Sequence, residues 1–386
     1  MQERIKSLFD EFFESEKSSG IILIFATIVS LLLANSALGA NYLKLWDTEV
    51  GIKIGSFELY KSLGYWINEG LMAFFFLLVG LEIERELYVG ELSTKEKAFL
   101  PVLAAIGGMA VPALLYYSFN KGTATASGIG IPMATDIAFA LGILSLLGNR
   151  VPFSLKIFLA ALAIIDDLGA IIIIAVFYVH DFSLTHLLIA LGIYAVMISC
   201  NRFRVKNIPV YLVLGGIMWY FMLKSGVHAT ITGVLTAFAI PFNRGDERSP
   251  STRLQHALHK PVTFWVMPLF ALANTGILLS SDILKSAFDP NVLGIFFGLV
   301  LGKPLGILLF TWLGMKLWGV KLPADIRFSQ IIGMGFLAGI GFTMSMFITL
   351  LAFSDQNYVV TSKTIILGAS IVAGTIGYII LRKKRV

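Results

Sequence analysis

The sequence predicts an all-α polytopic membrane protein. Of its 386 residues 57% are hydrophobic and only 14% are charged, whereas about a quarter of the residues of a typical soluble domain are charged. Long apolar runs recur along the whole chain, each able to cross about 30 Å of hydrocarbon as a helix. These runs lack the alternation of lipid-facing strands, so helices are expected rather than a barrel.

About twelve membrane-spanning helices are expected within a single transporter domain, residues 19–381. The predicted spans are 19–37, 61–86, 98–119, 125–148, 153–179, 184–200, 208–222, 226–241, 257–279, 291–316, 329–353 and 361–381. The even number of spans places both termini on the same side of the membrane.

The distribution of basic residues predicts which side that is. With both termini cytoplasmic, 22 of the 30 Lys and Arg residues lie in cytoplasmic segments, including the basic tail 382–386, and seven lie outside. This imbalance follows the positive-inside rule. The net charge of +6 then faces anionic lipid headgroups of the bilayer, and nucleic-acid binding is a poor explanation for it.

Residues 1–18 predict a helix that lies on the cytoplasmic membrane surface. Their apolar side chains follow the spacing of an amphipathic helix: Ile5, Leu8, Phe9, Phe12 and Phe13. The segment is too acidic for a signal peptide, and a solvated arm is the alternative to an interfacial helix.

Between the first two spans, residues 46–58 alternate apolar with Gly, Lys and Ser residues, which predicts a short β-hairpin outside the membrane. A bare hairpin leaves pairing edges open, so a homodimer contact is one interpretation and a loop that caps the bundle is the other. The single Cys200 cannot form an intrachain disulfide.

Four ionisable side chains lie at membrane depth in this arrangement: Asp136, Asp166, Asp167 and Lys303. Each costs several kcal/mol there, so a purely structural Asp–Lys pair would have to account for all of them. Three acids and one base leave surplus carboxylates, which either take up protons or bind cations.

Asp166 and Asp167 are neighbours in "ALAIIDDLGAI" (161–171). Because adjacent helical residues point about 100° apart, one can line a cavity while the other reaches another helix. Burial and like-charge proximity favour proton uptake by at least one of them near physiological pH. Carboxylate oxygens also suit a hard cation such as sodium or lithium. A site that holds either protons or such a cation predicts an exchanger, and no cofactor is expected.

Two predicted spans are interrupted. The interrupting residues, and the polar residues that follow them, are Gly128, Gly130, Pro132, Thr135 and Asp136 in one, and Gly339, Gly341 and Thr343 in the other. These spans take matching places in the ranges 98–179 and 291–381, which predicts inverted repeats with a site at the midplane. Glycine kinks that serve helix packing are the alternative.

If both helices unwind and cross, two helix N-termini meet on one side and two C-termini on the other, each carrying about half a charge. We expect Asp136 to compensate the positive ends and Lys303 the negative ends. Two continuous helices at 127–142 and 336–347 would contradict this hypothesis.

Six motifs together resemble the NhaA family of bacterial sodium/proton antiporters, and the resemblance runs through essentially the whole chain. They are "FFFLLVGLEIEREL" (74–87), "PMATDIAFALGIL" (132–144), "ALAIIDDLGAI" (161–171), "SGVHATITGVLTAF" (225–238), "LGKPLGI" (301–307) and "AGIGFTMSMFI" (338–348).

The resemblance implies a twelve-helix bundle that works by alternating access, with a cytoplasmic funnel ending at Asp166 and Asp167 as the ion-binding, proton-exchanging pair. By the same resemblance, Thr135 and Asp136 belong to an unwound helix, and Lys303 to the helix crossing and to a salt bridge with Asp166.

The resemblance also implies a pH-responsive cytoplasmic cluster of Glu82, Arg85 and Glu86, tuned by His228. Interfacial anchoring of the cluster and an ordinary role for the histidine are the alternatives. The chain departs from the family at Glu84, where a basic residue is expected, and at Gln255, where a glutamate is expected.

The function expected from these residues is export of Na+ or Li+ in exchange for H+, electrogenic and pH-regulated. The alternatives are a sodium-coupled organic-anion symporter, a passive cation channel and an intramembrane aspartyl protease. The site neighbourhood is Ala, Ile and Leu without a solute pocket, and one carboxylate pair makes no continuous polar file. The chain also lacks a Gly-x-Gly-Asp signature, so an enzyme is not expected.

Overall fold

The computed structural model describes residues 2–54, 57–90, 92–179, 181–243, 248–278 and 286–383. The chain forms two compact units, each assembled from separate stretches. Unit 1 comprises residues 1–25, 91–170 and 279–386, and unit 2 comprises residues 26–90 and 171–278. Two helices, α1 (Gln2–Ala34) and α7 (Phe153–Phe177), pass from one unit into the other.

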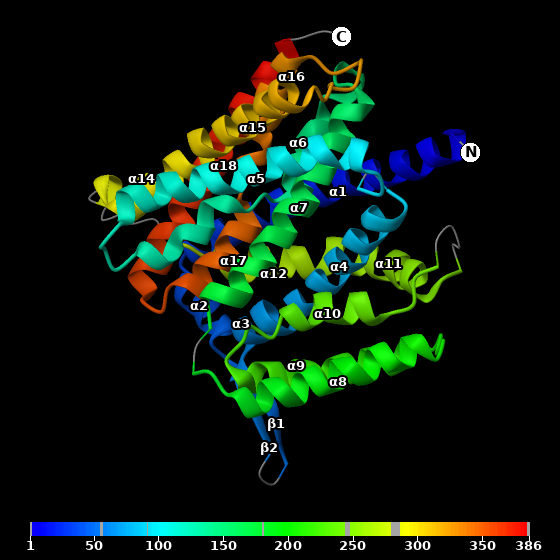
Figure 1. Ribbon diagram of the computed structural model, residues 1–386. Coiled ribbons are helices and arrows are strands. Elements are labelled where there is room, and N and C mark those ends of the chain that lie inside the picture. The colour runs from blue at the N-terminus through cyan, green and yellow to red at the C-terminus, as the bar shows by residue number, and fades with distance from the viewer. Residues whose placement is uncertain are drawn as a thin grey trace. The chain divides into compact units, whose positions relative to one another are not determined.

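Besides its parts of α1 and α7, unit 1 contains α-helices, most of them labelled in Figure 1, and short 3-10 or π-helical pieces, which are named η here. In chain order they are α5 (Lys95–Asn120), η2 (Ala126–Met133), α6 (Ile137–Leu146), η3 (Gly148–Arg150), η5 (Ser286–Phe288), α14 (Pro290–Phe297), η6 (Gly298–Gly302), α15 (Lys303–Trp318), α16 (Phe328–Ala338), α17 (Phe342–Ala352) and α18 (Gln356–Lys383).

Unit 2 contains helices and one two-stranded antiparallel sheet. Its elements are α2 (Gly39–Trp46), β1 (Glu49–Ile54), β2 (Phe57–Ser62), α3 (Leu63–Tyr65), η1 (Trp66–Leu71), α4 (Met72–Tyr88), α8 (Leu184–Arg202), α9 (Ile208–Ser225), α10 (Ile231–Ala239), α11 (Pro250–Pro261), η4 (Val262–Val266) and α12 (Met267–Asn274).

The helical membrane fold is confirmed, with fewer clear crossings than the sequence predicts. Eight helices in the described part of the chain are long and apolar enough to cross a membrane, or up to ten if each of two bent pairs is one span. The two missing crossings are 226–241 and 257–279. The first contains only the nine-residue α10, and the helical stretch covering the second begins with the polar α11.

In unit 1 the long helices α5 and α15 lie against each other (Figure 1). Their backbones approach closely at Gly306, where an added Cβ would overlap the carbonyl group of Gly107. Small residues allow such contacts between helices in a membrane, where van der Waals packing rather than the hydrophobic effect drives association. α15 begins with Lys303, so this packing fixes the helix that carries the buried lysine.

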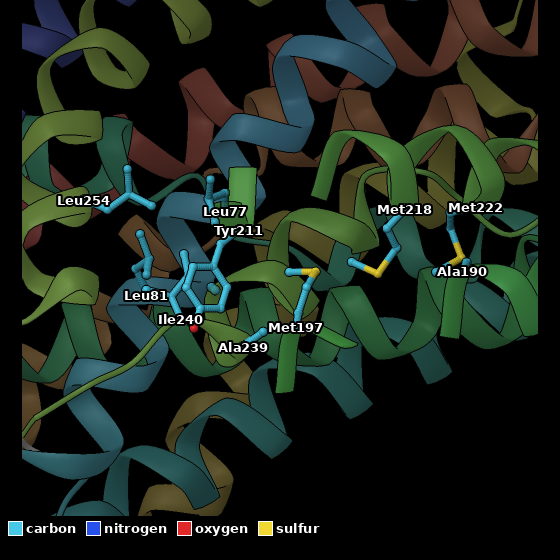
Figure 2. Packing of buried hydrophobic residues seen from close by; sticks show 11 residues of the cluster. Leu77, Leu81, Ala190, Met197, Tyr211, Met218, Met222, Ala239, Ile240 and Leu254 are labelled. Carbon is cyan, nitrogen blue, oxygen red and sulfur yellow. The ribbon is translucent and has the colours of Figure 1, made fainter. Parts of the chain in front are cut away.

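A buried apolar cluster lies in unit 2 (Figure 2). It joins α4, α8 and α9 through Leu77, Met197, Tyr211 and Met218, each at most 4% exposed. The Tyr211 hydroxyl donates to the Val205 carbonyl at 2.9 Å, which satisfies the one polar group of that side chain. The cluster therefore holds the helix pair α8 and α9 to α4.

The hairpin expected at 46–58 is present as β1 and β2, with Glu49 opposite Ser62 and Ile54 opposite Phe57. Residues 55–56 at its tip lie outside the described residues. The N-terminal segment is helical from Gln2 and continues without a break through Ala34. The interfacial position of 1–18, the extent of the transporter domain (19–381) and the basic tail 382–386, of which 384–386 lie outside the described residues, stay predictions.

Candidate functional site

Both predicted interruptions are present in unit 1. The 3-10 segment η2 ends at Met133, residues 134–136 are non-helical, and α6 begins at Ile137. α16 ends at Ala338, and α17 starts after a break with a bend of 46°. The break contains Gly339 and Gly341, and an added Cβ on Gly339 would overlap the Leu299 carbonyl group. Neither helix is continuous. The two continuous helices at 127–142 and 336–347 that would have contradicted the hypothesis are therefore not found.

The two non-helical segments are joined by hydrogen bonds. The Asp136 amide donates to the Ile340 carbonyl at 2.7 Å. The Thr135 hydroxyl lies 3.0 Å from the carbonyl oxygen of Ala338, the last residue of α16. These contacts satisfy backbone groups that the interruptions leave without helical partners, which is a condition for irregular backbone at membrane depth.

Asp136 lies at the N-termini of two helices. One carboxylate oxygen accepts from the Phe139 amide of α6 at 3.0 Å. The other accepts from the Thr343 amide of α17 at 3.1 Å and from the Thr343 hydroxyl at 2.5 Å. Because each helix N-terminus carries about half a positive charge, one carboxylate can balance both.

Lys303 is fully buried at the start of α15, directly after the π-helical turn η6. Its ammonium group lies 2.9 Å from Asp166 Oδ2 and donates to the Met133 carbonyl oxygen at the end of η2. The lysine therefore contacts an acid and the C-terminal end of η2 together, and its role in charge compensation stays a prediction.

Asp166 and Asp167 lie on α7, at 0% and 2% exposure. Asp166 Oδ2 also accepts from the Thr135 hydroxyl at 2.8 Å. That hydroxyl has one hydrogen, so it serves either Asp166 or the Ala338 carbonyl at a given moment. Among the described residues, Asp166 Oδ1 has no hydrogen-bond partner.

The charges of this site do not cancel. Asp136, Asp166 and Asp167 are three potential negative charges, and Lys303 is one positive charge. The helix N-termini balance roughly one more charge at Asp136. The rest must be neutralised by a proton or by a cation, because an uncompensated buried charge is costly. Carboxylate, hydroxyl and carbonyl oxygens are the ligands that hard cations prefer.

The residues assigned to a pH response do not form one group. Glu82, Arg85 and Glu86 lie together on α4, where Arg85 Nη2 is 2.9 Å from Glu86 Oε1. His228 lies in the turn before α10 and contacts a different acid, Glu69, at 3.4 Å. Their role in pH response stays a prediction.

The two departures from the family pattern are both buried in unit 2. Glu84 is 5% exposed and accepts from the Ser251 hydroxyl of α11 at 2.8 Å. Gln255, 8% exposed, lies one helical turn further along α11. The acid at position 84 thus has a polar partner on the same helix that carries the substituted position 255.

Sequence reasoning missed Glu69 as a fifth ionisable group at membrane depth. It lies in the π-helical turn η1 inside the span Leu63–Tyr88 and is 8% exposed. Its position within the predicted span 61–86 was a sufficient signal, because an ionisable residue inside a span is a candidate functional residue by default.

Membrane-spanning helices, two of them interrupted and crossing beside buried carboxylates and a buried lysine, define a secondary ion transporter. The comparison with known proteins gives the family. The chain belongs to the Na+/H+ antiporter 1 family, whose model matches residues 10–381. Membership makes it a multi-pass Na+/H+ antiporter and not an enzyme, which confirms the expected class and sets aside the symporter, channel and protease interpretations.

Bacterial relatives cover nearly the full length of the chain. A Na+/H+ antiporter NhaA of Flavobacterium psychrophilum is 58% identical over 379 residues, 98% of this chain and 97% of the relative. The antiporter NhaA of Dechloromonas aromatica is 54% identical over 98% of this chain and 96% of its own length. An antiporter NhaA 1 of Klebsiella pneumoniae is 47% identical over 100% of this chain and 98% of its own length. The predicted resemblance is therefore confirmed.

Proposed function

We propose that the protein exports Na+, or Li+, from the bacterial cytoplasm in exchange for H+ at a single site formed by Asp166 and Asp167. Access to the site alternates between the two sides of the inner membrane, and both termini are cytoplasmic. The observation that carries the proposal is the contact of Lys303 with Asp166. Both side chains are fully buried, and the lysine occupies a carboxylate oxygen that a cation would need.

Exchange then follows from competition for the carboxylates. Sodium that enters from the cytoplasm takes the place of the protons at the aspartates, which leave to the cytoplasm, and it displaces Lys303 from Asp166. Where Lys303 carries one of the two protons of the cycle, it releases that proton to the cytoplasm as it leaves Asp166. The Thr135 hydroxyl, 2.8 Å from Asp166, turns its oxygen toward the cation and donates its hydrogen to the Ala338 carbonyl. After the site opens outward, protons neutralise the carboxylates and sodium leaves.

The exchange is electrogenic, with two protons entering for each sodium ion that leaves. The two protons reload both aspartates, or one reloads an aspartate and Lys303 takes the other as its pairing with Asp166 re-forms. One net positive charge moves inward per cycle, so the membrane potential contributes about 2.3 kcal/mol per 100 mV. That energy corresponds to roughly a fifty-fold sodium gradient without any pH difference.

Two further parts of the proposal concern regulation and assembly. The activity responds to pH through Glu82, Arg85, Glu86 and His228, with Glu84 and Gln255 changing the response from that of the family. The protein forms a homodimer through the hairpin 46–58, because β1 and β2 form a two-stranded sheet whose outer edges stay open for pairing.

The test is sodium-driven proton movement in reconstituted vesicles. Asp167→Asn keeps the size of the side chain but removes the charge, so sodium-dependent proton release should fall to background. Asp289→Asn, an exposed aspartate before α14, is the matched control and should keep wild-type exchange. Preserved exchange in the Asp167 variant would refute its assignment as a ligand.

A further inference from the structure

A buried polar cluster in unit 1 is not part of the ion site. Its members come from α5, the start of η2, α14 and α18, and each is at most 5% exposed: Tyr116, Asn120, Thr125, Asn291 and Ser362. We call them the Tyr116 cluster. Neutral polar groups in such surroundings are costly unless each finds a hydrogen-bond partner. The members of the cluster bond to one another and to nearby backbone carbonyl groups.

Asn120 uses all the hydrogen-bonding capacity of its amide hydrogens. Its side-chain nitrogen donates to the Tyr116 carbonyl at 3.0 Å and to the Pro290 carbonyl at 2.9 Å. Its oxygen accepts from the Thr125 hydroxyl at 2.7 Å. One side chain thus joins the last turn of α5, the first residue of α14 and the residue that precedes η2.

Tyr116 continues the connection. Its hydroxyl lies 2.7 Å from the Thr125 carbonyl oxygen and 2.9 Å from Asn291 Oδ1, and Asn291 Nδ2 donates to the Ser362 hydroxyl at 2.8 Å. The single hydroxyl hydrogen of Tyr116 can serve one of its two acceptors at a time. These contacts extend the cluster from Thr125 through α14 to α18.

Close packing leaves these side chains little freedom to rearrange. An added Cβ on Gly294, one turn after Pro290 on α14, would lie 2.5 Å from Asn120 Nδ2 and 2.7 Å from Tyr116 Cδ2. Real atoms do not approach so closely, so only glycine allows α14 to lie against the cluster. The cluster is therefore a fixed point between α5, η2 and α14.

Two segments of similar length lead from this fixed point to the ion site. η2 follows Thr125 directly and reaches Met133 over eight residues, about 16 Å at 3-10 rise. The helix from Asn291 reaches Lys303 through α14 and η6, about 18 Å at α-helical rise. At the far end the Lys303 ammonium group donates to the Met133 carbonyl.

We propose that the Tyr116 cluster is a positioning device, which holds η2 and α14 in one register and so sets how strongly Lys303 competes with sodium for Asp166. The inference rests on the proposed exchange at Asp166 and Asp167. If the register loosens, Lys303 is held less firmly against Asp166 and the Met133 carbonyl. Sodium then displaces it more easily.

Tyr116→Phe tests this by removing one hydroxyl and keeping the ring. In proteoliposomes we expect the apparent KM for sodium to fall about fivefold, the size of effect that one net hydrogen bond produces. The maximal rate should stay within about twofold. Tyr117→Phe, the exposed neighbour on α5, should change neither quantity.

Ser362→Ala interrupts the same chain of bonds at its other end and serves if the tyrosine variant does not fold. It should lower the apparent KM for sodium as well. The double variant should change KM by less than the sum of the single effects, because both substitutions break one connected unit. Additive effects, or a lower maximal rate with unchanged KM, would overturn the inference. If the wild-type protein shows no sodium-driven proton movement, the proposed function fails instead.

Discussion

The pairs Lys303–Asp166 of unit 1 and His228–Glu69 of unit 2 both place a base beside an acid that lies within a candidate membrane span, but their surroundings differ. The first pair is fully buried with a separation of 2.9 Å. In the second pair the separation is 3.4 Å, and the side chains are 14% and 10% exposed. Each pair accompanies a π-helical turn, η6 before Lys303 and η1 around Glu69, a feature frequent at functional sites.

Their partners differ as well. Lys303 donates to the Met133 carbonyl at the end of η2, and Asp166 accepts from the hydroxyl of Thr135 in the non-helical segment that follows. In the second pair, Glu69 Oε2 and His228 Nε2 have no hydrogen-bond partner among the described residues. Breaking a fully buried, hydrogen-bonded pair costs far more than breaking a loose and partly exposed one. The comparison shows that only the first pair carries a large free-energy cost when it is broken, so the proposed displacement of Lys303 requires a cation that compensates the Asp166 carboxylate.

The largest effect is expected from Lys303→Met. It leaves Asp166 buried without its base, which costs about 3–5 kcal/mol for a pair of this kind. Thermal unfolding in detergent at neutral pH should therefore occur at a clearly lower temperature. Lys321→Met, which removes an exposed lysine, should leave the unfolding temperature nearly unchanged.

A double variant sharpens the same comparison. Asp166→Asn combined with Lys303→Met removes both charges, so the protein should unfold at a higher temperature than with Lys303→Met alone. If the double variant is as unstable as the single one, lost packing rather than the stranded carboxylate explains the effect of Lys303→Met.

A smaller effect is expected from Asp136→Asn. The amide can still accept hydrogen bonds, but it no longer balances the N-termini of α6 and α17, which costs about 1–2 kcal/mol. Asp355→Asn is the matched control, because Asp355 accepts from the Asn357 amide at the exposed start of α18. Equal changes in unfolding temperature for the two variants would contradict the role of Asp136 as a shared charge for two helices.

The elements of the ion site that could be predicted from sequence are those with a strong local signal. Gly and Pro residues marked both interruptions, and Asp136 and Lys303 were visible as charges in apolar surroundings. The π-helical turns were not visible, since one extra residue in a turn barely changes an apolar pattern. Glu69 was overlooked although its charge inside the predicted span 61–86 was a sufficient signal.

The Tyr116 cluster shows a second limit. Its members are neutral, and tyrosine, asparagine and serine are unremarkable in helices when considered one at a time. The contact of Tyr116 with Asn291 joins residues 175 positions apart, so no local pattern reports it. A single sequence indicates where charge must be compensated, but not which neutral side chains hold the compensating groups in register.

The smallest effect is expected from Glu69→Gln. Glu69 and His228 are 3.4 Å apart in a loose pair, so the substitution should lower the unfolding temperature by an amount equivalent to less than about 1 kcal/mol. Glu49→Gln, an exposed acid of β1, should leave the unfolding temperature unchanged. A loss as large as that of Lys303→Met would mean that the pair of unit 2 stabilises the fold as strongly as the fully buried pair of unit 1, and the contrast between the two pairs would then fail.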